Sequence, residues 1–530
     1  MICGKEMAKY LFLPHASCNF ESFQKLSKLL VSRVKDHNGL ASIISQVKNL
    51  SSTPALPGLK AAIDKAENTI PNLDFYGRLL PKIQAWALEC TKLFPSGKLN
   101  QLPSGGTGKV ELTRSQVRSI LSATFFDVPI GSLSMFSLYN SSNNVGVARI
   151  MCQIAYFHQI STENQNILED EHIIVNRRCS SSFPDWSTLD KPLSAASFSS
   201  ELRIEESKAL SHVDFANAKL HIGRILPSAT QEEILFSIKP ELFIAVLIAD
   251  EGMKENESIR IEGARQYSDY SGYLDSFTFL GVKKQCFSPV PDIIAIDALI
   301  AKGNNQFEEA NMRRDTNKAY LGFFPRIRDD EVDATVSSGN WGSGAFGGDV
   351  SLKFVQQLLA ASAAGVMLEY STFQNPSLEK RLKAINDMLQ SKTVSQVWKI
   401  LCSYSPSSEN ECLIQKIAQY HGSKQVQALK HWNKAIELEE LGSFGDSVAQ
   451  YSRAFRLWPA LDSPACDHDN IPREVLLEAN ACGVPKTLFV TQTDNVVAPY
   501  LTGDSESMKN RASNLPVSDF ENHLKRCLCA

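Results

Sequence analysis

Continuous apolar runs in the second half of the chain most strongly limit its fold. Runs without polar alternation are typical of strands buried on both faces, and helices must cover those faces. The strand candidates are residues 213–216, 242–249, 259–261, 293–299 and 366–370. Segments with helical spacing lie between them, at 231–238, 310–323 and 352–364. The pattern predicts a three-layer α/β/α domain over residues 201–410.

The first part of the chain has helical periodicity instead. Apolar residues recur every three or four positions within 23–34, 117–125 and 150–157, which predicts a mainly helical domain over residues 1–200. A Pro/Gly/Ser-rich segment at 94–109 is predicted to be a loop. Its Ser104-Gly-Gly-Thr-Gly-Lys109 sequence is similar to a phosphate-binding loop. However, Pro103 and Val110 stand where that motif needs Gly and Ser or Thr, so we favour a linker.

The last part of the chain differs again. Small and aromatic residues between 425 and 460 fall at the spacing of a single tetratricopeptide-type helical hairpin. One repeat cannot bury its own apolar face, so it would pack on the body or bind a protein partner. An unrelated helical hairpin explains the spacing equally well. We predict a helical extension at 411–460 and an irregular tail at 461–530.

Charge and cysteine content exclude several classes of protein. The chain has 54 basic and 58 acidic residues, so its net charge of −4 predicts neither direct nucleic-acid binding nor attraction to a membrane. Its 12 cysteines show neither zinc-ligand spacing nor a disulfide framework, which indicates reduced thiols. Neither a signal peptide nor a membrane span is expected. We predict a protein of the nucleus, the cytoplasm or both, without a metal or cofactor.

Two adjacent carboxylates, Glu232 and Glu233, open a predicted helix. Taken alone they have a structural explanation. Thr230 can cap the helix, and Glu233 can reach back to the Thr230 N–H to complete a capping box. Acidic residues in a first turn also favour the helix dipole. The residues around the pair give a functional alternative.

Several sequence blocks resemble those of the eukaryotic poly(ADP-ribose) glycohydrolase family. Val213-Asp-Phe-Ala-Asn217 is followed by Gln231-Glu-Glu-Ile234 at the family's spacing. Further similar blocks, in the family's order, occupy residues 267–273, 293–299, 313–320, 339–349 and 370–373, and upstream matches lie at 115–121 and 183–193. The resemblance covers about residues 80–410. It implies a macrodomain-like fold with an N-terminal helical accessory domain.

The resemblance also implies a reaction, the hydrolysis of ribose–ribose bonds in poly(ADP-ribose) carried by modified proteins. Breaking a glycosidic bond needs a carboxylic acid to protonate the leaving oxygen and a carboxylate to activate water. By resemblance, Glu233 takes this acid/base role. Glu232 would hold ribose hydroxyls with support from Gln231, and Asp214 and Asn217 would meet the ADP-ribose.

The family also implies contacts to the adenine and the diphosphate. Tyr273 and Phe373 would sandwich the adenine, whereas without the resemblance a core aromatic in a strand-rich region is the preferred interpretation of each. The glycine-rich segment 342–348 would hold the diphosphate, with Asn340 and Gly344 near the ligand and Phe346 over the scissile ribose. An ordinary strand-to-helix turn is the alternative for that segment.

One loop departs from the family pattern. Where family members carry three consecutive glycines, this chain has His221-Ile222-Gly223, and only Gly223 remains to approach the ligand. Because a β-branched residue resists positive φ, the loop is expected to take another course or to block the pocket. The His221 imidazolium could replace lost phosphate donors, but a solvated histidine is the more usual outcome. Arg224 is an equal candidate for a phosphate partner.

Three functions follow. The first is a glycohydrolase that uses Glu233 as its general acid/base. The second is a catalytically weakened or inactive protein that still binds ADP-ribose or its polymer; restoring glycine at positions 221 and 222 should then create or raise activity. The third is an adaptor that works through the hairpin at 425–460.

Overall fold

The computed structural model describes residues 9–16, 20–284, 289–325, 327–328, 331–332, 334–404 and 431. They fall into two compact units. Unit one takes the described residues up to Phe183, together with Ser207–Asp297 and Leu321–Ser337. Unit two takes Pro184–Glu206, Ala298–Tyr320 and the described residues from Ser338 onward. The predicted hairpin at 425–460 and tail at 461–530 lie outside the described residues, and the predicted domain boundary near residue 200 stays a prediction.

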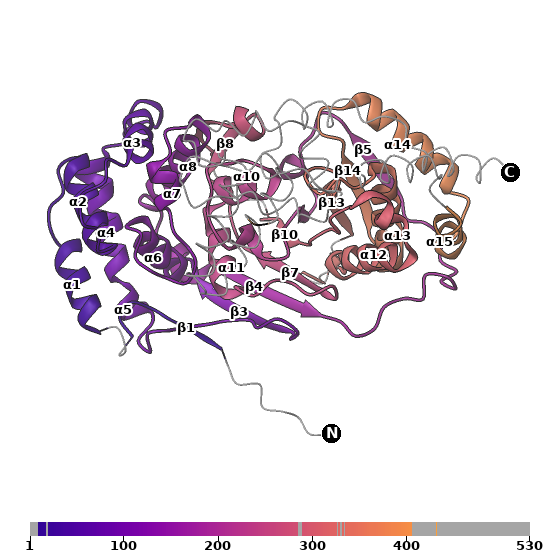
Figure 1. Ribbon diagram of the computed structural model, residues 1–530, viewed down its shortest axis with the longest axis horizontal. Helices are drawn as coiled ribbons and strands as arrows, with labels where there is room; N and C mark the ends of the chain where they lie inside the picture. Colours follow the sequence, from indigo (N-terminus) through magenta and orange to yellow (C-terminus); the bar gives the residue numbers. More distant parts are fainter. Residues whose placement is uncertain are drawn as a thin grey trace, which may run out of the picture. The chain divides into compact units, whose positions relative to one another are not determined.

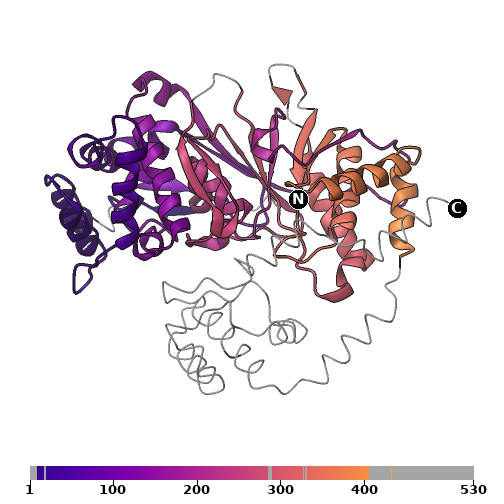
Figure 2. The same ribbon diagram turned by 90° about the horizontal axis from the view of Figure 1, so that it is seen from above.

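The front of unit one is helical, as its periodicity predicted. Figures 1 and 2 show its helices gathered together, in indigo and purple. They are α1 (Phe20–Leu30), α2 (His37–Val47), α3 (Pro57–Thr69), α4 (Leu80–Leu88), α5 (Cys90–Leu93), α6 (Arg114–Phe125), α7 (Phe136–Asn140), α8 (Asn144–Ile160) and α9 (Gln165–Asp170), with a π-helical turn at Phe75–Leu79.

Helix α8 is almost entirely buried within this unit. Its N-terminus is capped by Asn143, whose side chain accepts a hydrogen bond of 2.6 Å from the Gly146 N–H. Buried residues occur on every face of the helix, because α3, α7, α10 and β9 all pack against it. A polar side chain on α8 therefore needs partners within the protein, and Arg149 is such a side chain.

None of the described helices is long and apolar enough to span a membrane.

Unit one also contains a mixed sheet with the strand order β3-β4-β7-β10-β6-β13, in which the last two residues of β13, Ser338 and Gly339, belong to unit two. β3, β4, β7 and β10 pair antiparallel in turn, whereas β10 pairs parallel with β6, and β6 with β13. The strands are β3 (Gly108–Thr113), β4 (His172–Cys179), β7 (Glu257–Glu262), β10 (Asp292–Ala295), β6 (Ser211–Asp214) and β13 (Thr335–Gly339). A separate hairpin joins β8 (Ser268–Ser271) to β9 (Thr278–Val282), and β1 (Tyr10–Phe12) pairs with β2 (Lys98–Asn100).

Two predictions about unit one were wrong. The apolar run 242–249 forms helix α11 (Phe243–Ile248) rather than a strand, because a short buried run has no periodicity that separates the two structures. The predicted loop at 94–109 contains strand β2 and the start of β3. The other strand candidates and all three helix candidates coincide, wholly or in part, with β6, β7, β10, β14, α10, α12 and α13.

The glycine-rich segment near residue 105 binds carboxylates of the protein itself. The Ser104 N–H donates to Glu251 Oε2 at 2.7 Å, and the Gly105 N–H donates to Glu257. Its backbone donors therefore already have anionic partners, which agrees with the linker interpretation.

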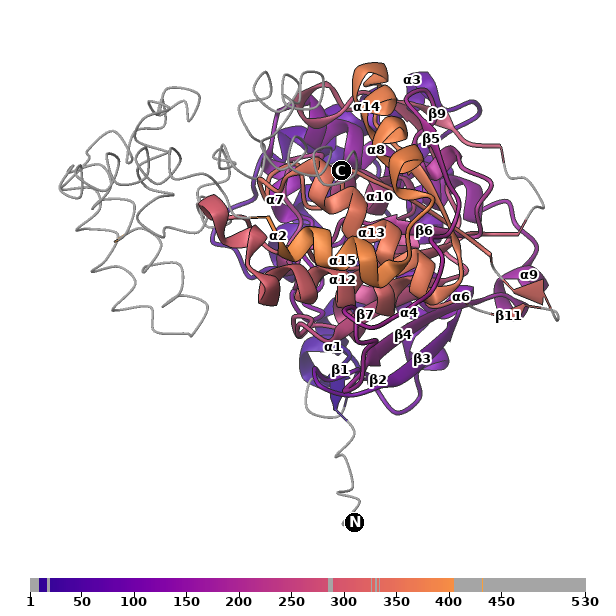
Figure 3. The ribbon, with the colours of Figure 1, turned by 90° about the vertical axis from the view of Figure 1, so that its right-hand side faces the viewer.

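Unit two is an α/β assembly around the parallel pair of β14 (Met367–Ser371) and β5 (Ala196–Ser199). Its main helices are α12 (Glu309–Phe323, whose last three residues belong to unit one), α13 (Val350–Ala364), α14 (Pro376–Leu389) and α15 (Val394–Cys402). Figure 3 shows α12, α13 and α15 close together. The Arg313 guanidinium of α12 lies 5.1 Å from the centre of the Trp398 ring of α15, which fixes these two helices to each other.

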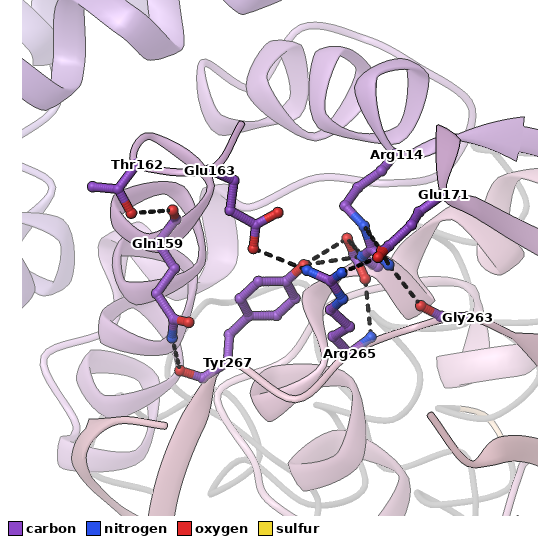
Figure 4. Close-up of polar contacts among 9 residues, drawn as sticks. Arg114, Gln159, Thr162, Glu163, Glu171, Gly263, Arg265 and Tyr267 are labelled. Carbon is purple, nitrogen blue, oxygen red and sulfur yellow. Dashed lines mark hydrogen bonds and ion pairs between the residues drawn. The ribbon is translucent and has the colours of Figure 1, made fainter. Parts of the chain in front are cut away.

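A buried ionic network connects the helices of unit one to its sheet (Figure 4). Arg114, 1% exposed, pairs with the fully buried Glu241 and donates 3.0 Å to the Tyr267 hydroxyl and 2.9 Å to Glu171 Oε2. Arg265 pairs with Glu163 at 3.0 Å and with Glu171. Each buried charge has an opposite charge and further hydrogen bonds, as burial requires.

We predict that Arg114→Met destabilises unit one, because it leaves Glu241 buried without its cation. Breaking a buried pair in this way costs about 3–5 kcal/mol, so the thermal midpoint measured by circular dichroism should fall by several degrees. Arg78→Met is the control. The Arg78–Asp74 pair is exposed, at 68% and 46% of the two side chains, and its loss should change the midpoint little. Equal effects of the two variants would contradict the role of the network.

Candidate active site

The predicted carboxylates lie where strand β6 ends and helix α10 (Gln231–Ile238) begins. The Gln231 side chain makes this junction. Its Oε1 accepts from the Phe215 N–H at 2.8 Å, and its Nε2 donates to the Val213 carbonyl at 3.1 Å. Gln231 thus holds the first turn of α10 against the carboxyl end of β6, which brings Glu232 and Glu233 to Asp214.

Glu232 is held by three hydrogen bonds from the loop that connects β6 to α10. Asn217 donates its Nδ2 at 2.8 Å and its backbone N–H at 3.3 Å to Oε2, and the His221 N–H donates to Oε1 at 2.7 Å. Glu232 is 2% exposed. Burial raises the pKa of Glu232 to about 8, although these hydrogen bonds lower it.

Asp214 adds a third carboxyl group to the same place. It is fully buried, and neither carboxyl oxygen has a hydrogen-bond partner. Burial, followed by the charges of Glu232 and Glu233, raises the pKa of Asp214 well above its usual range. The environment of the cluster therefore disfavours the ionised forms of Asp214 and Glu232. A buried carboxyl without a partner is also a group that a ligand could satisfy.

Glu233 makes the structural contact that its position in the first turn predicted. Its Oε2 accepts from the Thr230 N–H at 2.6 Å, and its carbonyl accepts from the Ser237 hydroxyl at 2.6 Å. Glu233 is nevertheless beside the expected ligand groups. Burial and then the Glu233 charge raise the pKa of the Tyr273 hydroxyl, so these two residues of unit one lie close together. Tyr273 is held by its N–H bond of 3.0 Å to Ser276 Oγ.

The altered loop keeps a left-handed backbone without its glycines. His221, Ile222 and Gly223 have φ of 54°, 48° and 72°, so all three occupy the region that glycine favours. Ile222 thus has a positive φ despite its β-branched side chain, and whether the loop takes another course or blocks the pocket stays a prediction. A left-handed conformation costs roughly 1–2 kcal/mol for a residue with a Cβ, so other contacts must stabilise the loop.

The His221 ring supplies such contacts and is neither solvated nor a phosphate donor. It is 2% exposed and packs between Phe236 and Phe243, with ring centroids 5.3 and 5.4 Å away. Its Nδ1 lies 2.7 Å from the Arg224 carbonyl, and its Nε2 lies 3.0 Å from Arg149 Nη2. Because a guanidinium only donates, Nε2 accepts and the proton is on Nδ1. Burial and then Arg149 lower the pKa of His221 to about 4, so the ring is neutral.

Arg149 was not among the residues that the sequence analysis predicted for the site. Besides His221, it donates from Nε to Ser237 Oγ at 2.8 Å and from Nη1 to the Ser228 carbonyl at 2.9 Å and to the Leu226 carbonyl. One fully buried side chain of α8 thus holds both ends of the altered loop and the helix that carries the carboxylates. Burial lowers its pKa to about 10, against the opposing effect of Glu233, so it stays charged.

The remaining predicted residues belong to unit two. Asn340 Oδ1 accepts from the Tyr370 hydroxyl at 3.1 Å, and the Phe346 carbonyl accepts from the Ala301 N–H at 2.8 Å. Gly344 is exposed, and a Cβ there would meet no atom within 4 Å. Phe373 has a φ of 52° just after β14. Their approach to the carboxylates of unit one stays a prediction.

A buried ion pair lies beneath this glycine-rich turn. Lys353 of α13 binds Asp315, and the Asp315 carboxylate also accepts from the Leu299 N–H at 3.1 Å. A Cβ at Gly348 would come within 2.7 Å of Lys353 Cε and of the Gly342 carbonyl. The turn therefore needs glycine at 348 for packing, whereas at Gly344 the protein imposes no such limit. Among the described residues there is no cluster of His, Cys, Asp and Glu able to hold a metal.

Two family models match the chain in sequence. One, for the macro-domain fold of poly(ADP-ribose) glycohydrolase, matches residues 183–380, and the other, for its helical domain, matches residues 69–177. Together they cover more than half of the chain and confirm the predicted fold class, a macrodomain-like α/β fold with a helical domain before it.

Curated relatives agree with these models. Poly(ADP-ribose) glycohydrolase 1 of Caenorhabditis elegans is 28% identical over 313 residues, which are 55% of this chain and 39% of that protein. The Arabidopsis thaliana glycohydrolase 1 is 28% identical over 398 residues, 58% of this chain and 71% of the relative. The probable glycohydrolase 2 of the same plant is 31% identical, over 42% and 51% of the two chains. The match thus spans about two fifths of the length of the first of these relatives.

A solved structure of poly(ADP-ribose) glycohydrolase from Deinococcus radiodurans in complex with ADP-ribose is also similar. It is 22% identical and covers 37% of this chain and 84% of its own, with a TM-score of 0.24. At that score, no structural argument rests on it.

The raised pKa of Glu232 predicts a pH-dependent stability. An acid whose pKa is higher in the folded than in the unfolded state stabilises the fold below about pH 4.5, and this contribution is lost as pH rises towards 8. We expect the thermal midpoint of the wild type to fall relative to that of Glu232→Gln between pH 5 and 8. The free energy of unfolding behind this difference should change by up to about 1.4 kcal/mol per pH unit.

The comparison uses the slope, because loss of hydrogen bonds in Glu232→Gln adds only a constant offset. Glu255→Gln, a change at an exposed position outside the site, should keep the wild-type slope. A slope in Glu232→Gln equal to that of the wild type would show that Glu232 is ionised throughout this range.

Proposed function

Because the chain belongs to the poly(ADP-ribose) glycohydrolase family, we propose that it hydrolyses the ribose–ribose O-glycosidic bonds of poly(ADP-ribose) and releases ADP-ribose. The observation that carries the proposal is the buried junction of β6 and α10. It brings three carboxyl groups, those of Asp214, Glu232 and Glu233, to one place beside Tyr273.

The chemistry of that junction suits glycoside hydrolysis. The leaving oxygen has to receive a proton, and the attacking water has to lose one. Glu233 would perform both transfers in sequence, since its charge acts on the Tyr273 hydroxyl and its carboxylate carries no bond from Asn217 or His221. Glu232, fixed by those two residues, would orient the ribose hydroxyls. Proton transfer by a positioned group of this kind contributes about 10²–10⁴-fold to a rate.

Residues of unit two would complete substrate binding. Phe373 would stack on the adenine opposite Tyr273, and the turn with Asn340, Gly344 and Phe346 would hold the diphosphate and the scissile ribose. The open space at Gly344 supports this, because no protein atom demands glycine there. Polymer on modified proteins would be the substrate, in the nucleus, the cytoplasm or both. The hairpin predicted at 425–460 would offer a protein-binding site.

A second function, binding without turnover, is favoured by one observation. The carboxylate of Glu233 already accepts a short hydrogen bond from its own helix, and backbone N–H groups of the altered loop bind within the protein. Both contacts compete with a ligand. Under this alternative the chain recognises ADP-ribose through Asp214, Tyr273 and Phe373 but releases none from polymer.

Glu233→Gln separates the two functions. Glutamine at this position still completes a capping box, so the helix start should survive while the acid/base group is lost. For the glycohydrolase, we expect ADP-ribose release from polymer to fall at least a hundredfold, with ADP-ribose affinity by calorimetry within a few-fold of the wild type. Glu255→Gln should release ADP-ribose at the wild-type rate.

A wild-type protein that binds ADP-ribose but releases none would reject the glycohydrolase and support the binding function. A folded wild type that does neither would reject both. If Glu233→Gln retains full release, the acid/base role of Glu233 is wrong even though the activity is right.

A further inference from the structure

The altered loop poses a physical problem that its backbone alone does not solve. Two residues with side chains, His221 and Ile222, keep the left-handed conformation that precedes Gly223. The conformation matters, because the His221 N–H points from this turn to Glu232 Oε1, at 2.7 Å. A loop that relaxed to ordinary negative φ would turn that N–H elsewhere.

The two side chains of the turn differ in what they contact. The His221 ring is buried and makes a polar contact on each side, to the Arg224 carbonyl and to Arg149 Nη2. Ile222 is half-buried and carries the full steric penalty of a β-branched residue at positive φ. Histidine is among the residues that tolerate this region best. One side chain can therefore stabilise the turn, whereas the other opposes it.

Arg149 makes the ring contact a link to the rest of the site. The same guanidinium binds the Leu226 and Ser228 carbonyls beyond the turn and Ser237 in α10. The Ser237 hydroxyl in turn donates to the Glu233 carbonyl. A continuous chain of hydrogen bonds thus runs from the ring of His221 to the helix that carries both glutamates.

We propose that His221 is a positioning residue, whose neutral ring, held between Arg149 and the Arg224 carbonyl, fixes the left-handed turn that presents its N–H to Glu232. In this chain a buried side chain stabilises a left-handed turn that glycine residues could adopt without strain. This inference builds on the proposed function for its consequence in catalysis, but the anchoring itself does not depend on activity.

Glycine scanning at the two positions gives opposite expectations. His221→Gly removes the backbone strain at that residue but also the ring and both of its hydrogen bonds. Ile222→Gly removes strain only. If the ring is an anchor, amide hydrogen exchange of the full-length protein, measured by mass spectrometry on the peptide spanning residues 219–230, should speed up at least tenfold in His221→Gly. In Ile222→Gly it should stay equal or slow down.

A conservative variant separates anchoring from simple loss of volume. His221→Asn tolerates positive φ, and its Nδ2 can donate to the Arg224 carbonyl as the histidine Nδ1 does. We expect it to restore slow exchange, at least in part. In the release assay, His221→Gly should lose activity at least tenfold, and Ile222→Gly should keep or raise it.

Three outcomes would overturn the proposal. Unchanged or slower amide hydrogen exchange in His221→Gly would show that the ring does not stabilise the turn. Equal loosening by Ile222→Gly would show that any change in the turn has the same effect, and a failure of His221→Asn to restore protection would assign the effect to volume. A wild type without release activity would reject the proposed function alone, because the exchange comparison would still decide the anchor.

Discussion

Burying a guanidinium is unfavourable unless its donors find acceptors, and the way Arg149 meets this requirement determines the candidate site. Its acceptors are carbonyls and side chains of the loop after β6 and of helix α10, so the arginine can be buried only if these segments adopt their observed positions. The carboxylates are placed as a result. Glu233 in turn raises the pKa of Arg149, which helps to keep the guanidinium ionised.

The sequence predicted those parts of the fold whose signals are local. Helices α10, α12 and α13 were found from their spacing, and strands β7 and β14 from their apolar residues. The run that became α11 was misassigned because eight buried apolar residues look alike in either structure. Arg149 was missed because its partners lie more than 70 positions away in the chain, and nothing about one arginine in a helix indicates them.

In the candidate site, too, local signals could be predicted from the sequence and long-range contacts could not. The position of Glu233 in the first turn predicted its helix-capping contact, whereas the resemblance pointed to Asp214 and Glu232 as its neighbours. His221 could not be interpreted from sequence, because its burial depends on Phe236, Phe243 and Arg149 together. A substitution that looks damaging beside a motif can be accommodated by residues elsewhere, so the loss of a glycine does not by itself show that a loop has lost its shape.

The left-handed turn also changes how an anion would be received. The His221 N–H binds Glu232, the Ile222 N–H binds the Lys219 carbonyl at 2.8 Å, and the Arg224 N–H binds the His221 carbonyl at 3.1 Å. A diphosphate arriving there would not fill vacant donors at these positions. It would have to displace the Glu232 carboxyl group from the His221 N–H, so association would exchange one acceptor for another. This exchange would be easiest when Glu232 is protonated, because a neutral carboxyl group is the weaker acceptor.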